Sequence, residues 1–122
     1  MTLALGMITT DTADAESLGG WWAEQTGAQV TETNGGEYVI VQGGALPVLL
    51  AFQRVDDPTP GKNRLHLDLM APDLEAEVER LLTVGATLVE RRGDDNFRWT
   101  TLTDPAGNEF CVAQRDEAEA AL

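Results

Sequence analysis

Two segments with the periodicity of amphipathic helices interrupt a series of short apolar stretches along this chain. The first, from about Ala13 to Thr26, follows the capping sequence Asp11 to Asp14 and places Leu18 on one face with Trp21 or Trp22, three or four residues further along. Gly27 stands where helices commonly end in a left-handed residue. The pattern predicts a helix over residues 13–26 whose apolar stripe faces a core.

The second segment follows Pro72 and ends at Gly85. Its predicted apolar stripe consists of residues at helical spacing, namely Leu74, Val78, Leu81 and Leu82. The remaining apolar stretches, bounded by turn residues, predict strands at 2–10, 29–33, 37–42, 47–55, 64–70, 87–91, 97–103 and 109–114. The order of strand, helix and three strands therefore occurs twice.

The chain also repeats itself in sequence. The stretch from Gly27 to Glu32 has a close counterpart from Gly85 to Glu90, 58 residues further along. Each half is therefore interpreted as one βαβββ module. We expect a single α+β domain in which the two modules form a curved mixed sheet around a central cavity. Its parts are modules 3–55 and 64–114, a connector at 56–63 and a tail at 115–122.

Alternation along the strands assigns side chains to faces, because neighbouring strand residues point to opposite sides. In the last strand, Phe110 and Val112 are suited to pack under a helix, which turns Cys111 to the other face with its alternate neighbours Glu109 and Ala113. In the strand after the connector, the leucines at 65, 67 and 69 are expected to face a helix. The inward row of that strand is then Arg64, His66 and Asp68.

The repeat also pairs positions across the two halves. It maps Gln53 onto Cys111, and the first strands align so that Met7 lies opposite His66. These four residues form a pseudo-symmetric set in the expected cavity. Trp99 shares a strand face with aromatic and threonine neighbours two residues away, so we expect it on the cavity wall.

Charge and composition narrow the range of partners. The 122 residues carry a formal net charge of −13, which repels phosphate backbones and anionic membranes and argues against binding to either. A cationic or neutral small ligand suits such a field. Cys111 is the only cysteine, so an intramolecular disulfide is excluded. No signal-peptide pattern begins the chain, and we expect a cytoplasmic protein.

Two motifs carry a family resemblance. The strand Arg64 to Leu69 has the sequence RLHLDL, and the turn Asp104 to Phe110 has the sequence DPAGNEF. Together with the two βαβββ modules, they resemble the vicinal oxygen chelate superfamily, which includes glyoxalase I, extradiol dioxygenases and the fosfomycin- and bleomycin-resistance proteins. The resemblance covers about residues 3 to 114 and is greatest to the small glyoxalase-like domains of bacteria.

The resemblance implies a metal site that this sequence does not reproduce. Metal enzymes of the superfamily place His or Glu at four cavity positions, whereas this chain has Met7, Gln53 and Cys111 beside His66. Glutamine is a weak neutral ligand, and a thioether prefers copper(I). We therefore expect no metal. If a metal binds, its expected ligands are His66, Cys111 and Gln53, and Asp68 contributes only after a rearrangement.

The resemblance implies two alternative functions. One is binding of a small organic molecule in the cavity between the modules, without metal, as in the drug-resistance branch. The other is a metal-assisted lyase, isomerase or dioxygenase-type reaction on a small oxygenated substrate, with His66 as general acid or base. The sequence leaves open whether the chain is an enzyme.

Each candidate residue also has a structural interpretation. His66 can be a hydrogen-bonded residue held through Asp68 or Gln53, and Cys111 can be an inert thiol among apolar neighbours. The expected ligand-binding residues are Met7, Gln53, His66, Asp68, Trp99 and Cys111. The resemblance further implies a homodimer.

Overall fold

The computed structural model describes residues 5–114 of the chain. Two compact units divide between Pro60 and Gly61, inside the connector predicted at 56–63. The tail predicted at 115–122 and the first residues of the strand predicted at 2–10 lie outside the described residues.

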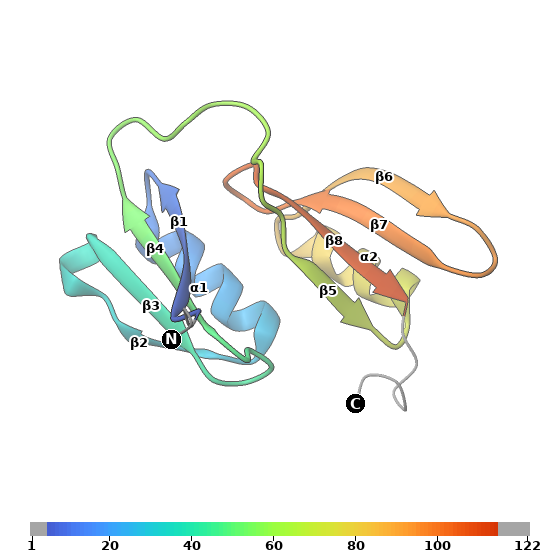
Figure 1. The fold of residues 1–122 in the computed structure, drawn as a ribbon, viewed down its shortest axis with the longest axis horizontal. Coiled ribbons are helices and arrows are strands. Elements are labelled where there is room, and N and C mark those ends of the chain that lie inside the picture. Colours follow the sequence, from blue (N-terminus) through green and yellow to red (C-terminus); the bar gives the residue numbers. More distant parts are fainter. Residues whose placement is uncertain (1–4, 115–122) are drawn as a thin grey trace, which may run out of the picture. The chain divides into compact units, whose positions relative to one another are not determined.

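The first unit is a four-stranded sheet with a helix along one face (Figure 1). Its elements are β1 (Met7–Thr12), α1 (Ala15–Thr26), β2 (Gln29–Glu32), the short 3-10 helix η1 (Asn34–Gly36), β3 (Tyr38–Gln42) and β4 (Leu49–Arg54). The strand order is β1-β4-β3-β2. β1 runs parallel to β4, and the other neighbours are antiparallel.

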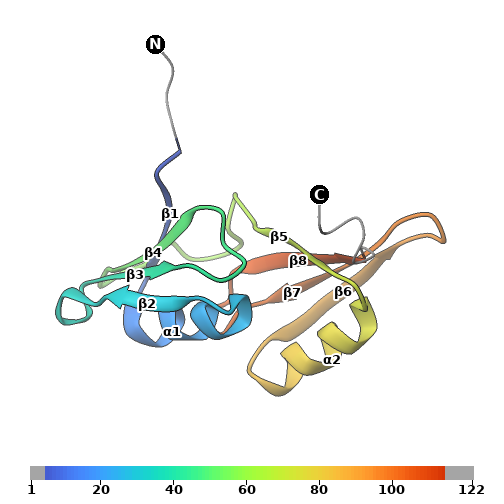
Figure 2. The same cartoon turned by 90° about the horizontal axis from the view of Figure 1, so that it is seen from below.

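The second unit repeats this plan. Its elements are β5 (Asp68–Ala71), α2 (Leu74–Thr83), β6 (Thr87–Gly93), β7 (Arg98–Thr103) and β8 (Glu109–Gln114). The strand order is β5-β8-β7-β6, with β5 parallel to β8. Figure 2 shows each helix lying along one side of its own sheet. The predicted α+β class of two βαβββ modules is confirmed. Within residues 5–114, neither helix has the length and apolar character that crossing a bilayer requires.

Capping and burial explain the limits of α1. The side chain of Asp14 accepts a hydrogen bond from the backbone N–H of Ser17 at 3.1 Å, so the helix begins at Ala15. Gly27 ends it in a left-handed conformation with φ of 67°. Trp22 is only 4% exposed and lies in the core, as its spacing predicted.

The start of α2 is attached to the end of β8. Asp73 accepts a hydrogen bond from the N–H of Ala76 at 3.2 Å. The side chain of Gln114 accepts from the N–H of Leu74 at 2.9 Å and donates to the carbonyl of Pro72 at 2.5 Å. These polar side chains therefore satisfy donors that the first turn of a helix leaves open.

Several predicted positions need correction. The strand predicted at 64–70 is β5, which begins only at Asp68. Leu65, predicted to face a helix, is 87% exposed, because the chain bends at residues 64–65 before the strand pairing starts. Leu82 is also exposed, whereas Leu81 is buried, since consecutive helical residues point about 100° apart. The strand predicted at 47–55 is β4, which begins at Leu49 after a bend.

Two adjacent glycines in α1 offer a matched pair of substitutions. A Cβ atom at Gly19 would lie 2.7 Å from Cγ1 of Val39, whereas a Cβ atom at Gly20 would meet nothing within 4 Å. We expect Gly19→Ala to lower the free energy of unfolding by about 1–3 kcal/mol through overpacking. Gly20→Ala should raise it by about 0.5–1 kcal/mol, because alanine favours the helix. Chemical denaturation measures both, and equal stabilities would contradict close packing of α1 on β3.

Candidate functional site

A pocket of about 450 Å³ opens on the sheet of the second unit. Its polar lining residues are Lys62, His66, Asp68, Arg92, Thr101, Glu109 and Cys111, and its aromatic ones are Phe97 and Trp99. Strand alternation explains the part of the lining that β8 supplies, whereas in β5 the consecutive residues Asp68, Leu69 and Met70 all line the pocket, although Leu69 was predicted to face a helix. In β8, Phe110 and Val112 are buried, while Cys111 between them faces the pocket.

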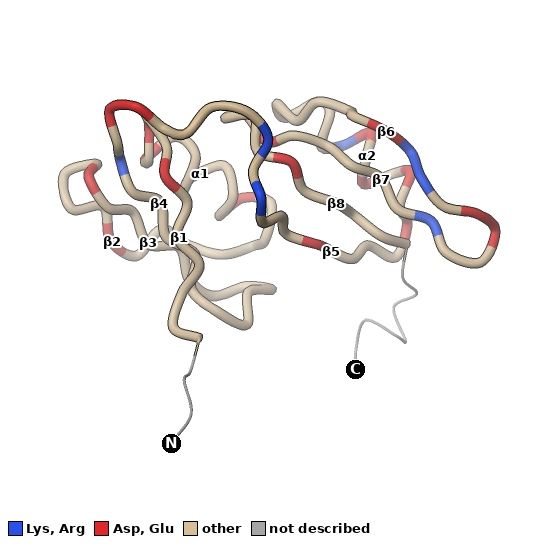
Figure 3. Tube along the Cα trace, turned by 45° about the horizontal axis from the view of Figure 1, so that its top comes forward, with Lys and Arg blue, Asp and Glu red and all other residues tan. Residues whose placement is uncertain are grey.

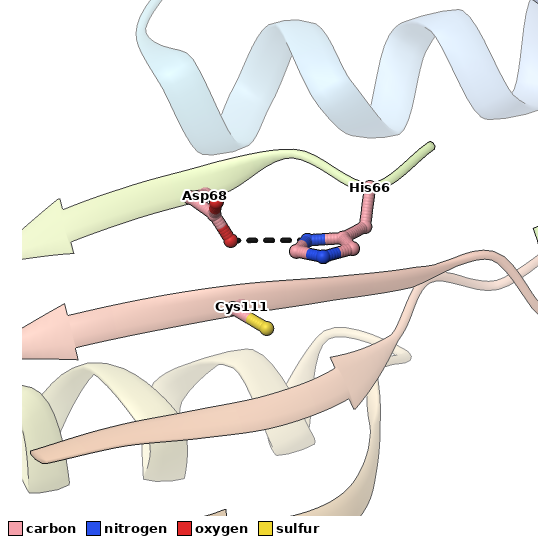
Figure 4. Close-up of side chains that lie close together, drawn as sticks. All are labelled: His66, Asp68 and Cys111. Carbon is pink, nitrogen blue, oxygen red and sulfur yellow. Dashed lines mark ion pairs between the residues drawn. The ribbon is translucent and has the colours of Figure 1, made fainter. Parts of the chain in front are cut away.

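Three side chains of the lining lie close together. Nδ1 of His66 is 3.0 Å from Oδ1 of Asp68. His66, Asp68 and Cys111 each offer one ligand-type atom, and these atoms lie within 4.8 Å of one another. Figure 4 shows the three side chains gathered beside the β5–β8 strand pair. We call this set the His-Asp-Cys cluster.

Local structure explains why the cluster forms. Asp68 pairs with Cys111 in the parallel ladder between β5 and β8. His66 precedes Asp68 by two residues and therefore shares its side of an extended chain. The ladder also extends to the residue before the start of β5, because the N–H of Cys111 donates to the carbonyl of Leu67 at 2.9 Å. The backbone beside His66 thus runs along β8 although it is outside the strand.

Asn63 holds this segment against β8. Its Oδ1 accepts a hydrogen bond from the N–H of Glu109 at 2.7 Å, and its Nδ2 donates to the carbonyl of Glu109 at 3.0 Å. The same amide group donates to the carbonyl of Leu65 at 2.6 Å. The Asn63 side chain therefore makes the two backbone hydrogen bonds that a neighbouring strand would make to Glu109. It also holds the backbone segment that leads to His66.

A hydrogen-bonded chain reaches the sulfur of Cys111 from the other side. Nε of Arg92 donates to Oγ1 of Thr101 at 3.2 Å. That oxygen lies 3.4 Å from Sγ of Cys111, and either atom can be the donor. The antiparallel ladders explain the arrangement, because Thr101 pairs with Cys111 between β7 and β8. The thiol is therefore in polar contact although Phe110 and Val112 flank it in sequence.

The positive groups of the pocket have acidic partners. Lys62 lies 3.8 Å from Glu109, and Arg92 lies 3.0 Å from Glu90. Figure 3 shows the basic residues of β6 next to the acidic turn that follows the strand. The pocket therefore holds charges of both signs, although the whole chain is strongly acidic.

One part of the pocket lining is aromatic. The rings of Phe97 and Trp99 have centroids 5.6 Å apart and planes tilted by 33°. Trp99 pairs across the β7–β8 ladder with Ala113, which also lines the pocket and whose small side chain leaves space beside the indole. Trp99 therefore lies in the wall of a pocket, as the alternation of its strand predicted.

Two candidate residues are not part of this pocket lining. Met7 and Gln53 belong to the first unit, in β1 and β4. Met7 pairs with Leu49, whereas Gln53 pairs with Asp11 at the other end of the same two strands. The four predicted positions therefore include only two, His66 and Cys111, that the structure groups in one pocket.

The pairing of Gln53 with Cys111 by the repeat is wrong. Ile40 of β3 pairs with Ala51, and Thr101 of β7 pairs with Cys111. Because Glu32 faces Ile40 and Glu90 faces Thr101, the counterpart of Cys111 is Ala51. A constant offset fails because more residues separate the paired Glu90 and Thr101 than separate the paired Glu32 and Ile40.

Sequence reasoning missed several residues of the site, among them Lys62, Asn63 and Arg92. The predicted strand at 87–91 was too short, and β6 extends to Gly93. Alternation over the longer strand would have placed Arg92 beside Trp99, its ladder partner. Lys62 and Asn63 lie in an irregular segment, where the sequence has no periodicity that assigns a direction to side chains.

The fold and pocket define a small α+β domain built from two βαβββ units. Residues 7–113 match the family of glyoxalase-like domains. The chain therefore belongs to the glyoxalase-like domain family, within the vicinal oxygen chelate fold that the two motifs indicated. No curated protein matches the chain in sequence.

Solved structures share this fold at low sequence identity. A glyoxalase/bleomycin resistance protein/dioxygenase family enzyme from Burkholderia phytofirmans has a TM-score of 0.77 at 16% identity, over 92% of this chain and 98% of its own. A fosfomycin resistance protein from Listeria monocytogenes has a TM-score of 0.75 at 13% identity, over 98% of each chain. Lactoylglutathione lyase from Agrobacterium tumefaciens has a TM-score of 0.66 at 14% identity, over 93% of this chain and 95% of its own. These similarities show a shared fold.

The superfamily's metal pattern fits this chain only in part. Of the four positions expected from the sequence, Met7 offers a thioether and Gln53 a neutral amide, which are poor ligands for a divalent ion. The strand register replaces Gln53 by Ala51, whose side chain offers no ligand atom. Asp68 is not one of the four, yet it places a carboxylate beside His66 and Cys111. The second unit thus has a carboxylate, that of Asp68, at a position outside the four of the superfamily pattern.

Asn63 gives a direct test of how the site is positioned. We expect Asn63→Ala to lower the free energy of unfolding by about 1–3 kcal/mol, because it leaves backbone groups of Glu109 without partners. The amide hydrogen of Glu109 should exchange faster with solvent, since it loses its acceptor. Hydrogen exchange followed by NMR measures this rate. Asn96→Ala, in the exposed β6–β7 turn, is the control, and unchanged Glu109 exchange in Asn63→Ala would contradict the assignment.

Proposed function

We propose that the pocket of the second unit binds a small organic molecule. The observation that carries this proposal is the combination, in one pocket of about 450 Å³, of an aromatic pair and a polar cluster. Ligand pockets commonly combine apolar surface with a few polar groups that orient the guest. The family membership supports the fold of such a site but does not identify its guest.

The proposed guest has an aromatic or apolar body and a polar end. The body would stack on the exposed surface of Phe97 and Trp99, and the polar end would hydrogen-bond to His66 or Asp68. The net charge of −13 favours a cationic or neutral compound. The two cations of the pocket do not oppose that preference strongly, because Lys62 and Arg92 each have a glutamate partner.

A metal-assisted reaction on a small oxygenated substrate is the second candidate function. The His-Asp-Cys cluster favours it, because a divalent ion held there would polarise a substrate oxygen. In that case the protein side chains orient the substrate, and the contact with Asp68 keeps the His66 ring in place. The reaction would be of the lyase, isomerase or dioxygenase type.

The remaining parts of the proposal concern the location of the protein in the cell and its oligomeric state. A cytoplasmic location and a homodimer stay predictions, drawn from the sequence and from the superfamily. The pocket lining lies entirely within the second unit, so the proposed binding does not require a dimer. Sedimentation of the purified chain at two concentrations tests the assembly.

Substitution of Trp99 tests the binding proposal. The probe is a set of small aromatic and heteroaromatic compounds that carry an amine, hydroxyl or carbonyl group, screened by NMR shift mapping on the whole chain. We expect bound compounds to shift resonances of the pocket residues. Trp99→Ala should raise Kd about tenfold, equivalent to about 1.4 kcal/mol of lost contact.

Val89→Ala is the control for this substitution, because Val89 is an exposed β-strand side chain outside the pocket lining. It should leave Kd within about twofold, since surface substitutions away from a site change free energies by less than about 0.5 kcal/mol. Binding that shifts only residues of the first unit, or an unchanged Kd in Trp99→Ala, would contradict the proposal.

A further inference from the structure

The pocket of the second unit contains as many basic as acidic side chains. Its lining has two carboxylates, Asp68 and Glu109, and two cations, Lys62 and Arg92. The whole chain has 21 acidic residues against 8 basic ones, and Lys62 is its only lysine. A guest that matches this balanced pocket carries one charge of each sign. Resting on the proposed binding of a small organic molecule, we infer that the guest is an aromatic zwitterion of the amino-acid type, with an ammonium and a carboxylate on one carbon.

Arg92 supplies the partner for the carboxylate of the guest. Its Nε donates to Oγ1 of Thr101, and its Nη2 lies 3.0 Å from Oε2 of Glu90. Its Nη1 has no hydrogen-bond partner within residues 5–114, so the guanidinium has donors to offer. Ion pairs between exposed side chains are weak, so Glu90 does not prevent Arg92 from binding a second carboxylate. Guanidinium groups bind carboxylates with two parallel hydrogen bonds.

Asp68 supplies the partner for the ammonium group. Its Oδ1 lies 3.0 Å from Nδ1 of His66, whereas its Oδ2 has no hydrogen-bond partner among the described residues 5–114. A carboxylate accepts hydrogen bonds at both oxygens, so the contact with His66 leaves an oxygen for the guest. Glu109 is the less suitable carboxylate, because the ammonium of Lys62 already lies beside it.

The two partners are close enough for the two ends of one small molecule. Nε of Arg92 lies 3.2 Å from Oγ1 of Thr101, which lies 3.4 Å from Sγ of Cys111. That sulfur lies within 4.8 Å of a carboxylate oxygen of Asp68. In an amino acid, the ammonium nitrogen and the carboxyl carbon lie about 2.5 Å apart. Hydrogen bonds of about 2.7–2.9 Å at both ends extend its reach to about 8 Å, which is comparable with the separation that these contacts allow.

The sheet register provides a place for the aromatic body. Ala113 pairs with Met70 across the β5–β8 ladder and with Trp99 across the β7–β8 ladder, and all three line the pocket. A small residue between a thioether and an indole makes a slot whose two walls favour aromatic rings. Met70 is 49% exposed and flexible, so it can turn to admit a ring although Ala113 is buried. Arg92 pairs with Trp99 in the same row, so the slot adjoins the carboxylate partner.

Four related indole compounds test the inference on the whole chain by calorimetric titration. Free L-tryptophan carries both charges, tryptamine only the ammonium, indole-3-propionate only the carboxylate, and 3-ethylindole neither. We expect L-tryptophan to bind with a Kd about tenfold below that of either singly charged compound, because it adds one charged hydrogen bond to each. NMR shift mapping should place it at Trp99 and Ala113.

Two substitutions test the ends of the guest separately. Asp68→Asn should raise the Kd of L-tryptophan and tryptamine about tenfold without raising that of indole-3-propionate. Arg92→Gln should raise the Kd of L-tryptophan and indole-3-propionate about tenfold without raising that of tryptamine. The matched controls are Arg91→Gln and Asp95→Asn, because neither residue lines the pocket. They should leave every Kd within about twofold.

Circular dichroism of each variant verifies that the fold is retained, and the comparison of the four compounds on the unaltered protein does not depend on the variants. The inference is overturned if L-tryptophan binds no more tightly than the singly charged compounds, or if either substitution weakens all three charged compounds alike. It is also overturned if none of the four binds. Binding of other compounds in the pocket would then leave the proposed function standing, whereas no binding in either experiment would contradict both.

Discussion

The parallel pairing of β5 with β8 is the constraint that positions the chemical groups of the second unit. These strands lie at the two ends of the unit in sequence, and parallel neighbours need a crossover connection, which α2, β6 and β7 supply. The ladder places Asp68 beside Cys111. Burial of Phe110 and Val112 fixes which side of β8 faces the core. A slip of one residue would bury Cys111 and expose both apolar neighbours, so the register is strongly specified.

β5 is only four residues long, and side-chain hydrogen bonds beyond both of its ends add to its pairing with β8. At one end, Asn63 hydrogen-bonds to both backbone groups of Glu109. At the other end, Gln114 bonds to the backbone around the start of α2. Each amide satisfies backbone groups that a longer strand or helix would satisfy itself. The position of His66 therefore depends on side-chain hydrogen bonds as well as on the sheet.

The sequence predicted most of the fold because its elements are locally encoded. Alternation in β8 assigned Cys111 to the pocket side, and the spacing of Leu18 and Trp22 located the core face of α1. The position of β5 was less predictable, since the leucine at 65 continues the apolar alternation although the chain bends there. The contact between Asp68 and Cys111 is long-range, and only the ladder register reveals it.

The two units share a fold but differ in the chemistry of their pocket-side rows. By register, the counterparts of Cys111 and Thr101 in the first unit are Ala51 and Ile40, neither of which can hold a proton or a metal. The core rows are mainly apolar in both units, for example Val41 and its counterpart Leu102, although the counterpart of Val39 is the buried Thr100. The opposite rows differ in polarity between the units, although Ala51 and Thr101 are both buried, so a repeated fold can keep its structure while one copy carries polar groups. The chemistry of this protein is therefore expected in the second unit, where Asp68 and Cys111 meet, and a symmetric pair of half-sites is not needed to explain it.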